Sequence, residues 1–498
     1  MEIIFNNKSL NTYTELGRVF RKTQETAESV VPDVNDDIGR IVSLQSQLYL
    51  KSKEFNGRGI TVGGELNASV LYITENEGSV SFVNLSKSFS LEFETADAAD
   101  EQLSQVKLHI SNCEARVLNP RKVSVCFEVS GELCYYAPQD IILETTLDSN
   151  ESGVHTLEES CGILAINAVC EKTFSISEQL IFPSGKPVPA QLIAQQLEYI
   201  VTDTQFIGTK AIVKGNVSIC VNYKNGDDSY PISTEFSLPF SQMVDTGVDA
   251  NDSCSIIIQP TSAYYRLLDT INGEKALECE LHALMQIVCR KRETVRYISD
   301  AYSNLMPVDI SRRVAVFTHS AETQRLRLCC EEHINIADDC ADVLCVFPSI
   351  TDTQLSGGKC VCSIQLDIIY RSRSGALSAA KRNLKAEGEC TTENPRLLSS
   401  RIADSYIRPD GTVLECRINT EHISSNIKSI EISGVEQLNT LEEKSYNFGD
   451  FPSLSLVRSE GESLWELAKR YHSSVELISL ASESSENGNK LLLIPKCI

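Results

Sequence analysis

A strand that ends in tyrosine occurs three times in the amino-acid sequence. Residues 64–72 (GELNASVLY) align with residues 215–223 (GNVSICVNY), and residues 364–370 (IQLDIIY) keep the same alternation. Apolar side chains recur at every second position, which places them on one face of a half-buried strand. The first two copies lie 151 positions apart, as Pro32 and Pro183 do, so the sequence predicts a tandem repeat of β units.

Other strands recur at related distances. The pattern of residues 89–93 returns at 236–240, and a later strand occurs three times, at residues 125–129, 278–282 and 415–419. Strands at such short spacing, with few long amphipathic helices, are typical of β-sandwiches and barrels. We therefore predict a mainly β chain with three tandem sandwich-like or barrel-like units, the third divergent, followed by a small α+β module.

The repeats and the polar segments between them divide the chain into expected parts. These are an N-terminal lead (1–25), three units (26–172, 173–305 and 306–435), a linker (436–452) and a C-terminal module (453–498). A chain of 498 residues is long enough for roughly three or four domains. Two segments predict helices that lead into the units, residues 188–197 and the equivalent residues 37–48.

The C-terminal module begins with a helical pattern. Ser463 and Glu466 have the spacing of a capping box, in which each side chain satisfies a backbone N–H at the helix start. The helix predicted within residues 461–471 has one apolar stripe, formed by Leu464, Leu467, Ala468 and Tyr471.

A second helix and a strand complete the module. Ser473 and Glu476 repeat the capping-box spacing before a helix predicted over residues 474–480. Residues 490–494 predict a strand that ends at Pro495. The expected order of the module is strand, helix, helix, strand.

This order and its motifs resemble a LysM domain. The matching residues are Gly461, Leu464, Ala468, Tyr471, Leu477, Leu493, Ile494 and Pro495. The sequence departs from the family at Glu462, Ser463 and Ala481, on the two loops that form the glycan groove in LysM proteins. The loss of the usual hydrogen-bonding side chains weakens the case for binding N-acetylglucosamine polymers.

The upstream units resemble the SPOCS repeat of spore-coat-associated proteins. The resemblance rests on residues 30–38, on residues 297–303 and on the strand from glycine to tyrosine. SPOCS repeats followed by a LysM module are the arrangement of SipL-type spore morphogenetic proteins of clostridial bacteria. The resemblance implies a cytoplasmic protein on the mother-cell side of the forespore surface, which recruits coat proteins through a spore morphogenetic ATPase. It also implies that the LysM module binds protein.

Charge and hydropathy exclude several partners. The 68 acidic residues outnumber the 45 basic ones and give a net charge of -23, so no basic stripe is expected to bind nucleic acid or anionic lipid. We expect no membrane span and no export signal, because no long apolar run and no signal-peptide pattern occurs. The 18 cysteines are then expected to be reduced thiols, many of them packed in the core.

No group of residues has the pattern of a catalytic or metal site. Cys360 and Cys362 are too close for paired zinc knuckles and share one face of a strand, which favours packing. His333, beside Cys329 and Cys330, is favoured as a surface histidine over a ligand. The sequence predicts a non-enzymatic protein with no cofactor and no metal. A hydrolase site assembled within the units is the alternative that a structure can test.

The candidate binding residues lie in the loops and helices of the module. They are Gly461, Glu462, Ser463, Leu464, Trp465, Lys469, Leu480 and Ala481. Trp465, the one tryptophan, is expected either to pack within the module or to anchor an exposed interface. Lys469, Arg470 and Lys490 make the module locally basic, which fits either a solubilising face or a patch for an acidic partner.

The leading hypothesis is a scaffold or adaptor in spore-coat assembly whose module docks to a spore morphogenetic protein. The alternative is a cell-wall protein that binds peptidoglycan or N-acetylglucosamine through the module. The sequence leaves self-association and the identity of the partner open.

Overall fold

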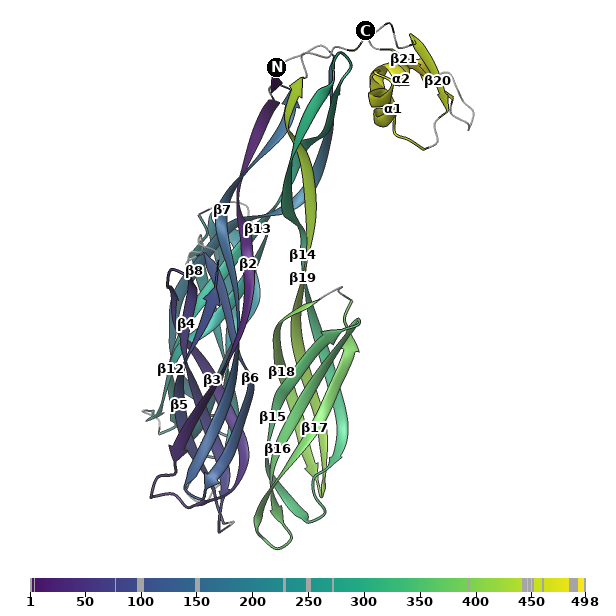
Figure 1. Cartoon of the computed structure of the whole chain (residues 1–498). Helices are drawn as coiled ribbons and strands as arrows, with labels where there is room; N and C mark the ends of the chain where they lie inside the picture. Colours follow the sequence, from purple (N-terminus) through teal and green to yellow (C-terminus); the bar gives the residue numbers. More distant parts are fainter. Residues whose placement is uncertain are drawn as a thin grey trace.

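The structure is a computed structural model of the 498-residue chain. It describes residues 2–3, 5–76, 78–95, 103–147, 153–226, 230–247, 252–270, 273–391, 395–440, 446, 449, 452–458, 461–482 and 491–496. Most of these residues lie in antiparallel strands, which confirms the mainly β class. Figure 1 shows three groups of strands and, at one end, a small module that contains the helices.

Three units follow one another, each built from six strands. Unit 1 contains β2 (Phe5–Val30), β3 (Ile38–Phe55), β4 (Gly59–Thr74), β5 (Val80–Glu94), β6 (Ser104–Asn119) and β7 (Lys122–Leu147). Unit 2 contains β8 (Val154–Ile181), β9 (Gln191–Ile207), β10 (Lys210–Lys224), β11 (Ile232–Asp245), β12 (Ser253–Asp269) and β13 (Lys275–Ser303). Unit 3 contains β14 (Val308–Asn335), β15 (Cys340–Ser356), β16 (Lys359–Ser372), β17 (Leu377–Glu389), β18 (Arg396–Asp410) and β19 (Val413–Thr440).

Each unit is a sandwich of two sheets. The second, third and fourth strands form a meander, such as β3-β4-β5, and the first, sixth and fifth strands form the facing sheet, such as β2-β7-β6. Alternating apolar side chains of both sheets fill the space between them, and each unit has its own buried cluster. The three tyrosine-ended segments of the sequence lie in β4, β10 and β16, the central strands of the three meanders.

The repeated tyrosine has the same role in every unit. Tyr72, Tyr223 and Tyr370 are buried at the end of their strands. Each hydroxyl donates a hydrogen bond to the loop that precedes the meander: to the Asp36 carbonyl at 3.2 Å, to the Pro187 carbonyl at 3.0 Å and to Asp339 Oδ1 at 3.2 Å. A buried phenol needs such an acceptor, so the repeat conserves a tether between the loop and the core.

The helices predicted over residues 188–197 and 37–48 are wrong, because these segments are parts of strands β9 and β3. A register shift between Asn222 and Tyr223 bulges β9, so that neighbouring residues Ile193 and Ala194 are both buried. Leu197 packs in the core of unit 2, whereas Ile193 and Ala194 pack against the other units. Burial on both faces of this bulged strand therefore produces a spacing of apolar residues that also fits a helix.

The first and last strands of each unit are much longer than the others and extend beyond the sandwich. They contain 26 to 29 residues, against 13 to 18 for the inner strands. Their paired ends are residues 5–17 with 135–147, 154–166 with 290–303, and 308–320 with 428–440. These ends pack around shared apolar clusters that include Leu10, Ile163, Phe317 and Ile432. We call this three-ribbon region the stalk.

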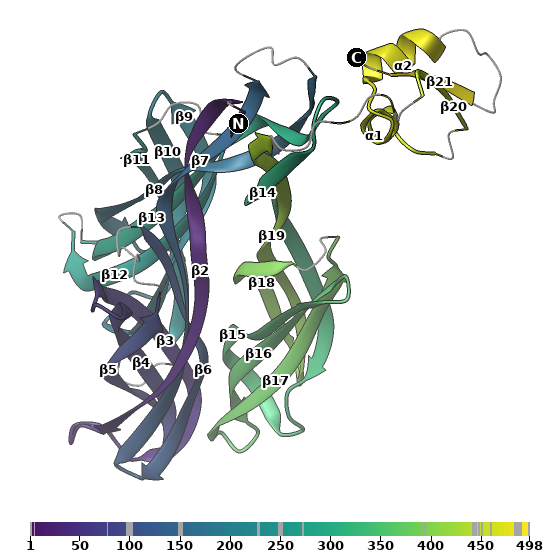
Figure 2. The same ribbon diagram turned by 45° about the horizontal axis from the view of Figure 1, so that its top comes forward.

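The N-terminus closes the stalk. Strand β1 (Glu2–Ile3) pairs with Asn439 and Leu438 of β19, so the first residues of the chain bind the last strand of unit 3. Figures 1 and 2 both place the N-terminus beside the end of β19. The last five residues of β19 (436–440), which the sequence assigned to the linker, belong to the same region, and four of them pair with β14.

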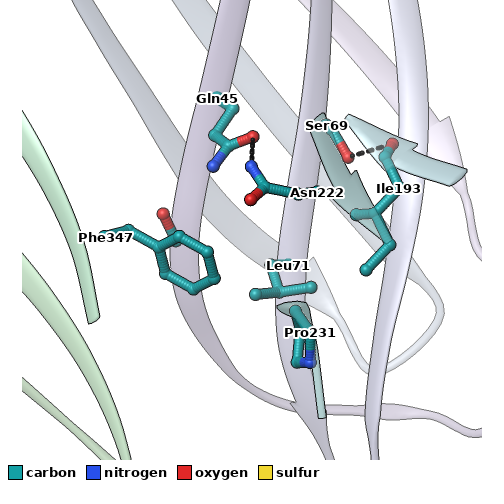
Figure 3. A pocket seen from close by; sticks show the side chains of 8 residues that line it. Gln45, Ser69, Leu71, Ile193, Asn222, Pro231 and Phe347 are labelled. Atoms are coloured by element: carbon teal, nitrogen blue, oxygen red, sulfur yellow. Dashed lines mark hydrogen bonds between the residues drawn. The ribbon is translucent and has the colours of Figure 1, made fainter. Parts of the chain in front are cut away.

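The three meanders also meet side by side. Val42 and Leu71 of unit 1, Ile193 of unit 2, and Phe347 and Ile369 of unit 3 form one buried cluster. A cavity of about 10 Å³, room for about one water molecule, lies at this junction. Figure 3 shows its lining, including hydrogen bonds from Asn222 to Gln45 at 2.6 Å and from Ser69 to the Ile193 carbonyl at 3.2 Å. The units are therefore joined at both the stalk and the meanders.

The expected boundary at residues 305 and 306 lies between β13 and β14, whereas two other expected boundaries fall inside strands. Strand β2 runs through positions 25 and 26, and β8 runs through positions 172 and 173. Most of residues 441–451 of the expected linker lie outside the described residues. Among the described residues, no helix is long and apolar enough to cross a membrane.

A half-buried carboxyl group lies between units 2 and 3. Glu198 of β9 is an electrostatic neighbour of Arg401 of β18. Burial raises the pKa of Glu198 to about 7, while Arg401 opposes the rise and the acidic residues Glu421 and Glu235 add to it. The charged form of Glu198 is therefore destabilised by its surroundings near neutral pH.

We expect the Glu198→Gln variant to be more stable than the unaltered chain at pH 8, by roughly 1–2 kcal/mol. The raised pKa means that ionisation costs stability as the pH rises from about 4.5 to about 7. The difference should therefore shrink toward zero below pH 4.5. Urea unfolding at both pH values measures it, with exposed Glu54→Gln as control. Equal stability at pH 8 would contradict the burial of this charge.

Candidate functional site

The C-terminal module has the predicted order of elements and its own core. Strand β20 (Leu454–Arg458) is followed by α1 (Leu464–Arg470), α2 (Val475–Ser482) and β21 (Leu491–Pro495), which pairs antiparallel with β20. Leu467, Ala468, Ile478, Leu492 and Ile494 are buried between the helices and the strand pair. The small α+β region expected from the sequence is confirmed as a fold.

The first predicted capping box is present. Ser463 Oγ accepts from the Glu466 backbone N–H at 3.2 Å, and the Glu466 carboxylate accepts from the Ser463 N–H at 2.9 Å. These hydrogen bonds lower the pKa of Glu466. The neighbouring Glu462 forms an ion pair with Arg470 at the end of α1. Both polar residues of the first candidate loop are therefore engaged within the module.

The second predicted capping box is wrong by one residue. Ser474 Oγ, not Ser473 Oγ, accepts from a backbone N–H of α2, that of Leu477 at 3.2 Å. Ser473 is fully buried, and its hydroxyl instead donates to the Pro495 carbonyl at the end of β21. The tertiary contact with the closing strand decides which serine is free to cap the helix.

Trp465 and Lys469 both contact one carboxylate of unit 2. Trp465 Nε1 donates to Asp300 Oδ2 at 2.8 Å, and Lys469 Nζ lies 2.8 Å from the same oxygen and 3.0 Å from Oδ1. Arg312 of β14 adds a hydrogen bond to Asp300 Oδ1 at 2.9 Å. The two side chains are four positions apart on α1, so they form one face of the helix. This face is docked on the end of β13.

Tyr302 completes the contact two positions further along β13. Its ring is 4% exposed and packs edge-on against Trp465, with ring centres 4.8 Å apart. Its hydroxyl donates to the Ser473 carbonyl at 2.8 Å, and its ring also stacks on that of His155 of β8. Such aromatic contacts add to apolar burial, so Tyr302 anchors the module to unit 2.

The electrostatics of the contact favour an ionised Asp300. Burial alone would raise the pKa of its carboxyl, but hydrogen bonds from Lys469 and Trp465 outweigh burial, and the pKa is lowered. Burial also lowers the pKa of His155, although Glu476 of α2 acts in the opposite direction. Near neutral pH the contact therefore joins a cation and an indole N–H to a carboxylate, beside a largely uncharged imidazole.

The structure does not bring all the candidate residues to one surface. Trp465 and Lys469 face unit 2, whereas Leu464 packs against the core of the module. Gly461 has a φ of 100°, which glycine adopts without strain, at the loop before α1. Leu480 is 69% exposed on α2, followed by the partly exposed Ala481.

The basic patch expected on the module is largely neutralised within the chain. Lys469 pairs with Asp300 and Arg470 with Glu462, while Lys490 lies outside the described residues. The outer face of the strand pair instead exposes four leucines: Leu454, Leu456, Leu491 and Leu493.

Asp300 and Tyr302 were not identified as site residues from the sequence. They belong to the segment 297–303 that carries the SPOCS resemblance, but no local pattern links them to Trp465, 165 positions from Asp300. Cys360 and Cys362, considered above as ligands, are buried in the core of unit 3. Among the described residues, no group of three or more His, Cys, Asp or Glu residues is placed to hold a metal ion.

Comparison with known proteins identifies one domain of the chain. The family model described as SipL, SPOCS domain matches residues 37–118. The match begins just before β3 and ends in β6, so it covers the meander and the outer strand of unit 1. Neither the curated proteins nor the solved structures include a match. Unit 1 therefore contains a SPOCS domain of the SipL family, which supports the resemblance of the chain to SipL-type SPOCS proteins.

Proposed function

We propose that this chain is a non-enzymatic scaffold or adaptor in the assembly of the spore coat. The observation that carries the proposal is the SPOCS domain, which connects the chain to sporulation. The proposed place of action is the mother-cell side of the forespore surface. The proposed partners are a spore morphogenetic ATPase and the coat proteins that it recruits, and no cofactor is required.

The architecture supports a structural role. Three sandwiches are joined through the stalk and through the meander cluster, so they hold their surfaces at fixed positions. The module has a separate core and is attached to unit 2 by the contacts of Asp300 and Tyr302. A rigid body with a small module at one end suits a protein that connects the forespore surface to the coat proteins.

The face of α1 that carries Trp465 and Lys469 is the proposed docking surface for the morphogenetic protein, which would bind this face in place of Asp300 of β13. A tryptophan beside a cation suits the recognition of an acidic and aromatic surface, because the indole provides area and a donor while the ammonium fixes charge. The loops that hold glycan in LysM proteins carry Glu462 and Ser463 here, and both side chains are already engaged. These contacts support a protein partner over a sugar.

Deletion of residues 452–498 is expected to abolish localisation of a fluorescently labelled chain to the forespore. The deleted module contributes its own core and leaves the clusters of the three units complete. The truncated chain should therefore keep a β circular-dichroism spectrum and accumulate normally. Normal localisation and normal coat formation with the truncated chain would contradict the proposal. Sedimentation of the full chain with purified peptidoglycan would instead favour a cell-wall glycan binder.

A further inference from the structure

The contact between α1 and β13 involves a short sequence pattern on the strand. Residues two apart on a strand share a face and lie about 6.6 Å apart, close to the spacing of residues four apart on a helix. Trp465 and Lys469 both bind Asp300, and Trp465 also packs against Tyr302, so two neighbours on the helix contact two neighbours on the strand. The face of α1 recognises an acidic residue followed, two positions later, by an aromatic one in an extended strand.

The same pattern occurs a second time in the chain. Residues 298–302 read Ile-Ser-Asp-Ala-Tyr, and residues 402–406 read Ile-Ala-Asp-Ser-Tyr. A β-bulge separates the isoleucine from the aspartate in both, between Ile298 and Asp300 in β13 and between Ile402 and Asp404 in β18. Both segments therefore have the same sequence pattern and the same local irregularity of the backbone.

The likeness does not come from the repeat. Strand β13 is the last strand of unit 2, whereas β18 is the fifth strand of unit 3. The last strand of unit 3 has Gly-Val-Glu-Gln-Leu at residues 434–438, beside the end of the stalk, without a tyrosine. A further Asp-x-Tyr at residues 228–230 lacks the preceding isoleucine, and its first two residues lie outside the described part of the chain.

The second segment is exposed. Tyr406 is 53% exposed, Asp404 is exposed as well, and β18 is the outer strand of its sheet. Within the described residues, neither side chain makes a hydrogen bond or an ion pair. Asp300 and Tyr302, by contrast, are covered by the module. The chain thus presents one covered and one uncovered copy of the pattern that α1 binds.

We propose that Asp404 and Tyr406 form the docking site for the C-terminal module of a second copy of this chain. In this contact, Trp465 and Lys469 of one copy leave their own β13 and bind β18 of the next copy. The module and β18 are different surfaces, so the contact is head-to-tail and can extend into rings or filaments. The inference does not depend on the role in the spore coat.

Competition within the chain sets the conditions for this assembly. The module is tethered near β13, which gives the internal contact an effective concentration in roughly the millimolar range. Arg312 also holds the Asp300 carboxylate in place. Binding to a second copy therefore prevails when the internal contact is broken, or when copies are concentrated on a surface.

Two substitutions in the full chain separate the internal contact from the contact between copies. Asp300→Ala removes the acceptor of Trp465 and Lys469, and we expect self-association in sedimentation velocity to tighten roughly tenfold or more. Adding Asp404→Ala should return the chain to a monomer. Adding Asp410→Ala, an exposed aspartate at the end of the same strand, should leave the association unchanged.

Trp465 is the only tryptophan, so its fluorescence reports on the docked face directly. Dilute Asp300→Ala chain should emit at longer wavelengths than the unaltered chain, and concentrating it should reverse the shift unless Asp404→Ala is also present. Three results would overturn the proposal: an unshifted emission in Asp300→Ala, a shifted but monomeric Asp300→Ala chain at all concentrations tested, or undiminished association of the double variant. Circular dichroism checks that each variant is folded.

Discussion

Replacement of Gln286 by leucine is expected to lower the free energy of unfolding by about 2–5 kcal/mol. Gln286 of β13 is fully buried where unit 2 meets unit 1. Its Oε1 accepts from the Val106 backbone N–H at 2.7 Å, and its Nε2 donates to the Val106 carbonyl at 2.8 Å. One side chain therefore makes the two backbone hydrogen bonds that a neighbouring strand would otherwise make at the outer edge of β6.

Leucine has a similar volume but leaves both backbone groups of Val106 buried without a partner, and each costs about 1–3 kcal/mol. Urea unfolding and the hydrogen-exchange rate of the Val106 amide measure the effect. The matched control is Gln205→Leu, at an exposed glutamine of β9, which should change stability by less than about 0.5 kcal/mol. If the Gln286→Leu chain is as stable as the control and protects the Val106 amide equally, the two hydrogen bonds between Gln286 and Val106 do not stabilise the contact between units 1 and 2.

Replacement of Gly215 by alanine is expected to destabilise unit 2 by about 3 kcal/mol or more. A Cβ at this position would lie 2.2 Å from the Ile200 carbonyl oxygen and 2.7 Å from the ring of Phe240. Because one of these atoms belongs to the backbone of the paired strand, rotation of a side chain cannot relieve the clash. The cost is therefore that of moving β9 away from β10.

The matched control for this substitution is Gly162→Ala in β8, where an added Cβ meets nothing within 4 Å. Gly64 in unit 1 faces the same restriction, since its Cβ would lie 2.4 Å from the ring of Phe89. Unit 3 differs: Cys362 occupies this position and pairs with Ala386 in place of a phenylalanine. Thermal unfolding that is equal for Gly215→Ala and Gly162→Ala would show that β9 can move away from β10 at little cost.

The sequence alone predicted the parts of the chain whose burial follows a local period. Alternation over residues 64–72 and 215–223 places Val70 and Val221 in the cores, and both are fully buried in β4 and β10. The Ser463–Glu466 cap was also predicted, because its hydrogen bonds lie within one helical turn. These features depend on neighbours a few residues away, which the sequence displays directly.

The contacts between units were not predictable in this way. Ile193 and Ala194 follow a spacing that fits a helix, yet they lie on a bulged strand whose two faces are buried by different units. Local periodicity records that a residue is buried, but not which part of the molecule buries it. The strand was misread because its second burying surface is formed by unit 3 and unit 1.

The sequence by itself thus determined the repeat, the strands that carry it and the order of elements in the C-terminal module. Only the tertiary structure decided which residues Trp465 and Lys469 of the module contact. Trp465 and Lys469 meet Asp300 because the stalk carries the end of β13 to the module, across 165 positions of chain. Helical and strand periodicities relate residues only a few positions apart, so no local pattern can link a carboxylate and an indole at that separation. The packing of the long strands sets their pairing.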